Sequence, residues 1–209
     1  MNKFAIILPT IGRETLRPAI ESVLVQTYQN YLLIVSHDTE SSYDIGNGLI
    51  GDNFRIMHVF AGNNAPSNDS GAAARNYAIQ FVPPDCNWIC YLDDDDIWHN
   101  TRLASFNSFI EMHIDEYEDY PYFQLFYSYA DLYKLKHKSP RSSEKRLKKI
   151  GVVNNVTAGG MCHKMEVFQK TKGWNPLNTE DHDRELYDEM KKHCVHDVLE
   201  QSTFDFIWR

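Results

Sequence analysis

The first 100 residues alternate between short apolar runs and segments with helical spacing. Continuous apolar runs are typical of strands that are buried on both faces of a parallel sheet. Three such runs occur, at 4–8 (FAIIL), 31–38 (YLLIVSHD) and 88–92 (WICYL), and 54–60 (FRIMHVF) alternates as a further strand. Helices are predicted between them, at 15–26, 43–50 and 71–82. This order predicts an α/β fold with a doubly wound, parallel sheet.

The helix predicted at 15–26 has clear local signals. Its apolar residues recur at helical spacing, at Leu16, Ala19, Ile20, Val23 and Leu24. Thr15 is a suitable N-cap, and Pro18 falls in the first turn, where its missing N–H does little harm.

The second half of the chain is less regular. A helix is predicted at 100–113, a long aromatic strand at 122–135, a further helix at 164–171 and a helical end to the stretch 175–193. The segment 134–149 carries eight Lys or Arg and one acidic residue, Glu144, and it is predicted to be an exposed loop or a short mobile helix. No repeat and no interdomain linker interrupts the pattern, so we expect one domain.

Composition narrows the class of protein. A length of 209 residues and a hydrophobic fraction of 43% are typical of a globular domain rather than a disordered chain. The net charge of -8 argues against general nucleic-acid binding. We see no signal peptide at the N-terminus and no apolar run long enough for a transmembrane segment.

Cysteine usage favours a reducing compartment. The four cysteines form no C-x-x-C pair and are too sparse for a disulfide scaffold, so we expect reduced thiols and a cytoplasmic protein. Cys194 lies between His193 and His196 in HCVH. A zinc site there lacks a convincing fourth ligand, so the end of a helix or a tail is the favoured interpretation.

Four adjacent aspartates, Asp93 to Asp96, follow the fourth predicted strand. Neighbouring carboxylates repel each other, so they are expected to be either solvated or gathered around a cation. Carboxylate oxygens suit Mg²⁺ and Mn²⁺, and strand geometry lets Asp93 and Asp95 face the same way. The alternatives are a solvated acidic turn or a cap for the helix near Asn100.

Polar groups follow each of the predicted parallel strands. Pro9–Arg13, Asp38, the loop before Arg75 and the aspartates should meet at one edge, where ligands of such sheets bind. Arg75 opens a helix after small residues, so it could pair with the aspartates or a phosphate, or simply lie on the surface. The chain has no G-x-G-x-x-G and no Walker-type G-K-[ST], so it lacks the dinucleotide and P-loop fingerprints.

A second acidic group, EDHD at 180–183, follows Gly173-Trp174 and precedes a predicted helix. Carboxylates in the first turn of a helix are favoured by its dipole, which explains them without a function. The other interpretation is a general base that takes a proton from an acceptor hydroxyl.

These motifs, in this order, resemble those of the GT-A fold glycosyltransferases of family 2. The segments that carry the resemblance are PTIGR, SHD, GAAARN, LDDDD and GW followed by EDHD, over about 4–190. The resemblance implies a Rossmann-like, doubly wound and mostly parallel sheet flanked by helices. It also implies a single domain, 1–209, with a nucleotide-sugar-binding half at 1–100 and an acceptor-binding half at 101–209.

The same resemblance implies inverting, D-x-D-type transfer of a hexose or deoxyhexose from a UDP-sugar donor to a hydroxyl of a glycan, a glycoprotein or another acceptor, with Mn²⁺ or Mg²⁺. Asp95 is then the metal ligand, and Asp93 contacts the ribose or the sugar. Asp38 accepts a hydrogen bond from uracil N3–H. The other implied nucleotide-sugar-binding residues are Pro9, Thr10, Arg13, Arg75 and Asp94.

By resemblance, Asp181 is the catalytic base and Trp174 helps to line the acceptor site. Glu180, His182 and Asp183 are secondary acceptor-site residues, and the base could also be Asp183, because RELYDEM departs from the usual continuation of the family. A second departure is Ile11, which stands where the family often has an aromatic residue that stacks on the base. Membrane helices of processive members are missing, so we expect one sugar per encounter.

Two other functions compete with this one. A nucleotidyltransferase acting on a sugar phosphate would also use carboxylate-bound metal, but it prefers a Gly- and Lys-rich loop after the first strand, and PTIGR has no lysine. An inactive binding module would not need both acidic motifs. More loosely, the chain resembles the glycosyltransferase domain of a chlorella-virus multidomain protein. We therefore also expect a longer multidomain chain and, if the protein is viral, a place in the host cytoplasm. The apolar ending FDFIWR further suggests a packed tail or an excised domain.

Overall fold

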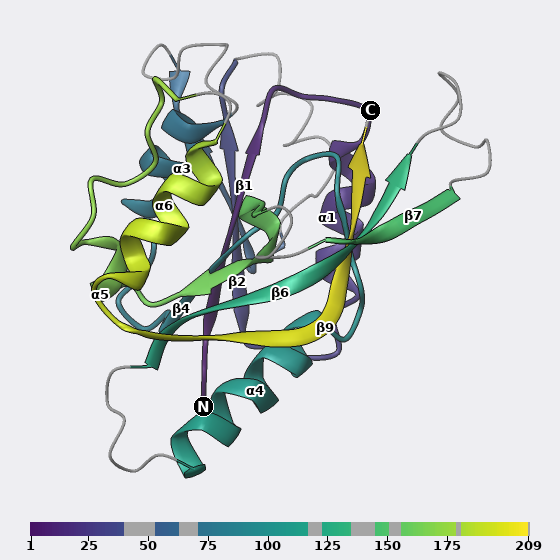
Figure 1. Cartoon of the computed structure of the whole chain (residues 1–209). Coiled ribbons are helices and arrows are strands. Elements are labelled where there is room, and N and C mark those ends of the chain that lie inside the picture. Colours follow the sequence, from purple (N-terminus) through teal and green to yellow (C-terminus); the bar gives the residue numbers. More distant parts are fainter. Residues whose placement is uncertain are drawn as a thin grey trace.

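The computed structural model describes residues 1–39, 53–62, 71–116, 123–134, 145–150, 156–178 and 181–208. Within them, nine strands form one sheet in the order β3-β2-β1-β4-β8-β6-β9-β5, and β7 pairs with β6 (Figure 1). The strands are β1 (Phe4–Thr10), β2 (Tyr31–His37), β3 (Ile56–Phe60), β4 (Trp88–Tyr91), β5 (Ile97–Trp98), β6 (Phe123–Lys134), β7 (Lys145–Ile150), β8 (Met161–His163) and β9 (Val195–Trp208).

Helices cover both faces of the sheet. They are α1 (Leu16–Leu24), α3 (Ala72–Ile79), α4 (Arg102–Glu116), α5 (Met165–Phe168) and α6 (His182–Lys191), with a short 3-10 helix, η2 (Ala158–Gly160). Apolar residues of α1 and α4 pack in one core, and those of α3, α5 and α6 pack in another. Figure 1 shows these two sets of helices on opposite sides of the sheet.

Strand β1 lies between the two cores. Phe4, Ile6 and Leu8 belong to one core, and Ala5 and Ile7 belong to the other. Side chains alternate across a strand, so a strand covered on both faces must be apolar at every position. This explains why FAIIL reads as a continuous apolar run.

The pattern of the first half is confirmed. β3, β2, β1 and β4 pair in parallel, as predicted, and α1, α3 and α4 fall within or close to the predicted helices. Thr15 is the N-cap of α1 but makes no side-chain cap hydrogen bond. The helix expected at 43–50 lies outside the described residues.

The basic segment contains a strand that the sequence did not predict. Lys145–Ile150 forms β7, antiparallel to Ala130–Lys134 of β6, so the expectation of a loop or helix there was wrong; 135–144 lies outside the described residues. On β6, Leu125–Tyr127 pair with β8, and farther along the strand Ala130–Lys134 take β7 as their partner. Lysines are common on edge strands because they discourage further pairing.

The C-terminal segment is a long strand that follows the end of α6, rather than a free tail. β9 pairs in parallel with β6 along its length and antiparallel with β5. Phe204 is fully buried, which confirms the packed tail that FDFIWR suggested. HCVH therefore lies at the junction of α6 and β9, and the thiol of Cys194 donates to Met190 O instead of joining a metal cluster.

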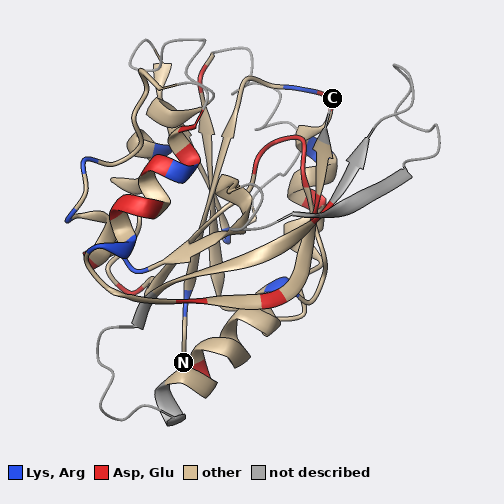
Figure 2. Ribbon diagram, viewed as in Figure 1, with Lys and Arg blue, Asp and Glu red and all other residues tan. Residues whose placement is uncertain are grey.

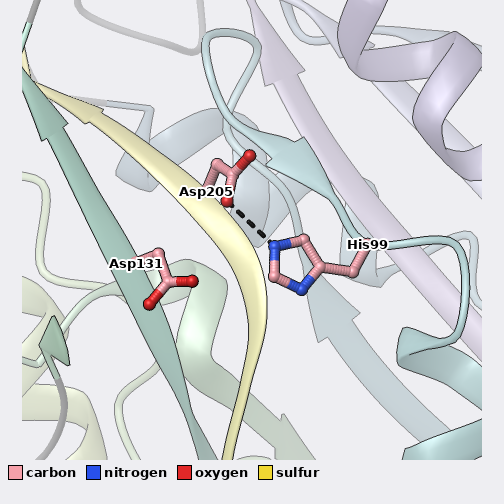
Figure 3. Close-up of side chains that lie close together, drawn as sticks. All are labelled: His99, Asp131 and Asp205. Carbon is pink, nitrogen blue, oxygen red and sulfur yellow. Dashed lines mark hydrogen bonds and ion pairs between the residues drawn. The ribbon is translucent and has the colours of Figure 1, made fainter. Parts of the chain in front are cut away.

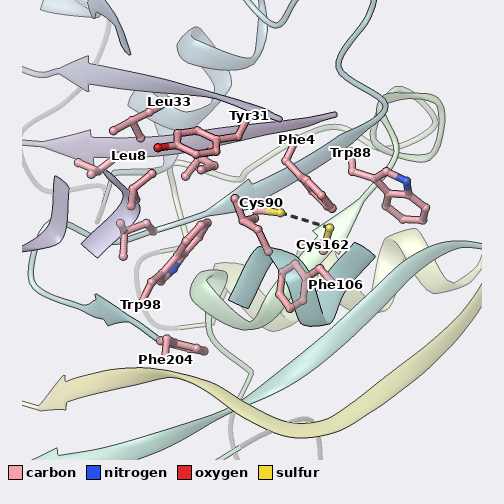
Figure 4. Close-up of a cluster of buried hydrophobic side chains, with 14 of the residues drawn as sticks. Phe4, Leu8, Tyr31, Leu33, Trp88, Cys90, Trp98, Phe106, Cys162 and Phe204 are labelled. Carbon is pink, nitrogen blue, oxygen red and sulfur yellow. Dashed lines mark hydrogen bonds between the residues drawn. The ribbon is translucent and has the colours of Figure 1, made fainter. Parts of the chain in front are cut away.

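A cluster of buried apolar side chains joins β1, β2, β4 and β9 to α4 (Figure 4). Cys90 and Cys162 lie within it, with their sulfur atoms 3.3 Å apart, and all four cysteines of the chain are free thiols. Across the parts of the chain that the structure describes, no helix combines the length and apolar character that crossing a bilayer requires.

Candidate functional site

A pocket of about 240 Å³ opens at the carboxyl ends of β1, β2 and β4. Its lining residues are Pro9, Thr10, Ile11, Arg13, Asp38, Gly71, Arg75, Asp93, Asp94 and Asp95. Because β2, β1 and β4 are adjacent and parallel, the segments that follow them arrive at the same edge. The predicted convergence of these polar groups is therefore present, and the acidic run forms the loop after β4, red in Figure 2.

Asp94 is tied down by the segment that follows β1. Thr10 Oγ1 donates to Asp94 Oδ2 at 2.7 Å, and Arg13 Nη1 donates to Asp94 Oδ1 at 2.6 Å. The side chain of Asp94 is 2% exposed. With both oxygens engaged, Asp94 holds Arg13 in place across the pocket, and Arg13 also lies 3.6 Å from Asp95 Oδ2.

Asp93 is paired with a buried cation. Arg75 Nη2 donates to Asp93 Oδ1, and the guanidinium of Arg75 lies over the ring of Trp174, 4.7 Å from its centroid. Burial raises the pKa of Asp93, the charges of Asp183 and Asp94 raise it further, and Arg75 opposes them. A further positive charge near Asp93 would therefore be favourable, even though Arg75 already pairs with it.

Asp96 lies apart from the other three aspartates. It is 1% exposed, and Oδ1 accepts a hydrogen bond from Ile207 N of β9 at 3.1 Å. Burial, with the charges of Asp93 and Asp95, raises the pKa of Asp96 well above its ordinary value. The run is thus neither uniformly solvated nor gathered around one point, because two of its members are buried against other parts of the protein.

The pocket fits a divalent cation. Four of its lining residues are aspartates and two are arginines, which leaves an excess of carboxylate charge. Arg13 and Arg75 directly face Asp94 and Asp93, whereas Asp95 is 23% exposed and lies farther from Arg13, at 3.6 Å. Carboxylate oxygens are the donors that Mg²⁺ and Mn²⁺ prefer, so Asp93 and Asp95 are suited to hold such an ion.

Gly71 shapes the wall of the pocket. Its φ is +82°, in the left-handed region that favours glycine, and a Cβ there would lie 3.1 Å from Pro9 Cγ. Sequence reasoning quoted GAAARN but gave Gly71 no role. The signal was available, since a glycine directly before a helix at a strand end marks a close approach of two backbones.

Trp174 packs against Arg75 of the pocket. It is 1% exposed, and its ring meets Tyr91 edge-on at 4.9 Å. Asn76 holds its backbone on both sides, accepting from Trp174 N at 2.9 Å and donating to Trp174 O at 2.7 Å. Asn76 was missed by sequence reasoning. Because Trp174 is covered by Arg75, its role at an acceptor site stays a prediction.

The second acidic motif approaches the pocket through Asp183. Asp183 Oδ2 accepts from Ala158 N at 3.0 Å, and Oδ1 lies 3.0 Å from His182 Nε2. Burial lowers the pKa of Arg75, but the charges of Asp93 and Asp183 raise it above its ordinary value. Arg75 is therefore the link between the acidic loop and α6.

Asp181 is placed differently. It is the exposed N-cap of α6 and does not line the pocket, and Glu180 lies outside the described residues. His182 is buried, and Nδ1 lies 2.9 Å from Asn178 O. Burial acts to lower the pKa of His182, but hydrogen bonding to Asp183 and the charge of that residue raise it.

The comparisons with known sequences agree on one family. The family model described as "Glycosyl transferase family 2" matches residues 5–172. The "Succinoglycan biosynthesis protein ExoW" of Rhizobium meliloti (strain 1021) is 33% identical over 111 residues, which are 50% of this chain and 33% of that protein. The "UDP-Glc:alpha-D-GlcNAc-diphosphoundecaprenol beta-1,3-glucosyltransferase WfaP" of Escherichia coli is 30% identical over 123 residues, 58% of this chain and 42% of that protein. The matches span less than half the length of these curated relatives.

The fold is shared with solved structures. S. aureus TarS 1-349 in complex with UDP-GlcNAc superposes with a TM-score of 0.71 at 12% identity, over 99% of this chain and 59% of that chain. At this identity the likeness concerns the fold, and it confirms the predicted fold class. The resemblance to a chlorella-virus protein stays a prediction.

Proposed function

This chain belongs to glycosyl transferase family 2, and from that premise we propose that it transfers a hexose or deoxyhexose from a UDP-sugar to a hydroxyl of a glycan or another acceptor. The observation that carries the proposal is the strand-end pocket, where Arg13 and Arg75 face two aspartates and leave Asp95 accessible. The UDP-glucose named as the donor of WfaP and the UDP-GlcNAc bound to TarS support this choice of donor.

The donor diphosphate is the part of the substrate that this pocket suits best. Asp93 and Asp95 would hold Mn²⁺ or Mg²⁺, and such an ion supplies charge stabilisation for the leaving diphosphate. Arg75, held by Asp93 and by the ring of Trp174, adds a fixed positive charge at the same side. Pro9, Thr10 and Arg13 flank the base, and Asp38 accepts from uracil N3–H.

Transfer with inversion requires a base on the side opposite the leaving group. In our proposal Asp181 takes the proton of the acceptor hydroxyl while the hydroxyl oxygen attacks the anomeric carbon and the bond to UDP breaks. Its exposed position at the N-terminus of α6 keeps the carboxylate accessible to an acceptor hydroxyl. Asp183, with both oxygens engaged by Ala158 and His182, positions α6.

The acceptor half of the site rests on the second half of the chain, 101–209. Trp174, Glu180, His182 and Asp183 are proposed to shape it, with single addition of a sugar per encounter. Because the matches span less than half of the curated relatives, the proposal includes a longer multidomain protein.

The test is calorimetric titration of UDP with Mn²⁺ and with a chelator. We expect binding to need the ion and to weaken at least about tenfold in Asp95→Ala, because a carboxylate that directly holds the ion is lost. Asp85→Ala is the control, since Asp85 is exposed, pairs with Lys3 and does not line the pocket. Equal UDP affinity with ion and with chelator would sink the proposal. Release of pyrophosphate from UTP and a sugar phosphate would favour a nucleotidyltransferase instead.

A further inference from the structure

Three potential metal ligands meet where β5, β6 and β9 lie side by side. His99 follows β5, Asp131 lies on β6 and Asp205 lies on β9. One ligand atom of each lies within 4.8 Å of the others, and among the described residues no other trio of His, Cys, Asp or Glu is so close. Figure 3 shows His99 and Asp205 facing each other, with Asp131 on the next strand.

Backbone register brings these residues together. Asp131 and Asp205 are direct partners in the parallel pairing of β6 with β9, and Ile97 of β5 pairs with Asp205 from the other side. The placement of two carboxylates and an imidazole is therefore a fixed property of the sheet rather than a chance contact of flexible side chains.

The imidazole of His99 is oriented for a ligand at Nε2. Nδ1 lies 3.2 Å from Ser202 O, and since a carbonyl only accepts, Nδ1 carries the proton of this hydrogen bond. Metal-binding histidines commonly donate their other ring N–H to a carbonyl in this way. Ser202 also donates from Oγ to Asp131 Oδ1 at 3.0 Å, so one residue orients two of the three ligands.

The distances and donor types select the ion. His99 Nε2 and Asp205 Oδ1 are 2.9 Å apart. Two ligands of a tetrahedral zinc ion, each about 2.1 Å from it, lie about 3.4 Å apart, so His99 and Asp205 would separate by about 0.5 Å to hold it. An imidazole beside two carboxylates suits Zn²⁺ better than Mg²⁺. We propose that His99, Asp131 and Asp205 form a second divalent-cation site, which prefers zinc and shares no residue with the strand-end pocket.

Occupancy of this site would join three strands that support the acidic loop. β5 begins directly after Asp96, and β9 donates Ile207 N to the carboxylate of Asp96. A zinc ion shared by β5, β6 and β9 holds both attachments of that loop. The competing state is a simple ion pair, in which a proton on Nε2 of His99 takes the place of the metal beside Asp205.

The chain offers a matched control for the ion pair. His113 has the same arrangement, with Nδ1 2.8 Å from Phe109 O and Nε2 2.8 Å from Asp197 Oδ2. In the described part of the chain this pair has no third ligand within reach. His113→Gln therefore removes a His–Asp pair without removing a proposed metal site.

The experiment titrates zinc into the metal-stripped chain against a chromogenic chelator, with excess Mg²⁺ present to occupy the oxygen-only pocket. We expect one tightly held zinc per chain. Asp131→Asn and His99→Gln should weaken it at least about tenfold, since loss of even a supporting group of a metal site has effects of this size. Asp95→Asn and His113→Gln should leave it unchanged.

Two results would overturn the site. One is that excess Mg²⁺ displaces all of the zinc that the parent chain binds. His99 and Asp205 would then form an ion pair only. The other is unchanged zinc affinity in folded Asp131→Asn, which keeps an acceptor for Ser202 and so preserves the local structure. If His99→Gln does not fold, as judged by far-ultraviolet circular dichroism, the Asp131→Asn titration decides alone. None of these readouts depends on glycosyl transfer, so they stand apart from the proposed function.

Discussion

At the scale of single residues, burial and hydrogen-bond partners together set the charge of His163 and of His182. His163 is fully buried, with Nδ1 3.0 Å from Lys164 O and Nε2 2.6 Å from the hydroxyl of Tyr91. A carbonyl accepts and a hydroxyl can donate, so this ring is satisfied in its neutral form. His182 instead has two acceptors, Asn178 O and Asp183, which favour the charged form.

The neutral state of His163 makes stability depend on pH. Burial lowers the pKa of His163 from 6.5 to about 4. The stabilisation is complete above the unfolded pKa and is lost as pH falls from 6.5 towards 4, because the unfolded chain binds the proton first. Between about pH 7.5 and pH 5 the free energy of unfolding should fall by about 2 kcal/mol more in the parent than in His163→Gln. Urea unfolding at both pH values measures it, and parallel losses in the two chains would contradict it.

Asp181 and Asp183 can be separated by matched substitutions. Asp181→Asn should keep UDP and Mn²⁺ binding while lowering transfer about 10²–10⁴-fold, the usual range for a lost general base. Asp183→Asn should be milder in transfer, because an amide oxygen can still accept from Ala158 N. The measurement is UDP release at saturating donor. Full activity of Asp181→Asn beside an inactive Asp183→Asn would move the base to Asp183.

At the scale of elements, η2 joins the helices behind the site to the sheet. Asp183 of α6 accepts from Ala158 N, and Arg102 of α4 donates to Gly159 O. The two glycines let η2 pack closely against the side chains of Phe204 and Tyr127. A Cβ on Gly159 would be 2.7 Å from Phe204 Cε2, and one on Gly160 would overlap the ring of Tyr127. A small change in η2 should therefore reach both α6 and β6.

Gly160→Ala should cost about 3 kcal/mol of unfolding free energy, the upper end for overpacking a rigid core. The ring of Tyr127 cannot move aside easily, because its hydroxyl accepts from Thr157 N at 3.0 Å. Denaturant unfolding gives the value. In a double-mutant cycle with Tyr127→Leu, which makes room for the methyl group, the cost of Gly160→Ala should shrink; strict additivity would show that the ring is not the obstacle.

At the scale of the whole molecule, the pocket is assembled from segments that are far apart in sequence. Thr10 and Asp94 are bonded across 84 positions, and Arg75 and Asp93 come from different elements. The chain carries a net charge of -8, so in the pocket the two arginines and a bound cation would supply the positive charge that a diphosphate needs. Donor binding should accordingly stabilise the entire sheet edge.

UDP with Mn²⁺ should raise the melting temperature of the chain. A ligand at a hundred times its Kd adds about 2.7 kcal/mol, which corresponds to about 5–10 °C for a domain of this size. GDP with Mn²⁺ should give a smaller shift, and Asp38→Ala should narrow the difference, since Asp38 is the proposed partner of uracil N3–H. Differential scanning fluorimetry is sufficient. The same preference for UDP in Asp38→Ala would remove Asp38 as the base reader.

The sequence alone determined the first half of the fold and the composition of the pocket. Strands buried on both faces leave continuous apolar runs, and parallel strands bring the residues after them to one edge. From this, the grouping of Pro9–Arg13, Asp38, Arg75 and the aspartates was predictable. Their roles as donor-binding residues came from the family resemblance and stay predictions.

Only the tertiary structure decided how the four aspartates differ and where the last strand goes. Asp94 accepts from Arg13 and Asp96 accepts from Ile207 N, whereas Asp93 and Asp95 stay partly exposed. These differences are set by partners up to 111 positions away. β9 forms because the backbone groups of β6 are available to pair with it, although the sequence of β9 shows no clear alternation of apolar and polar residues. A local pattern reports which residues are buried, but not which distant chain segment covers them.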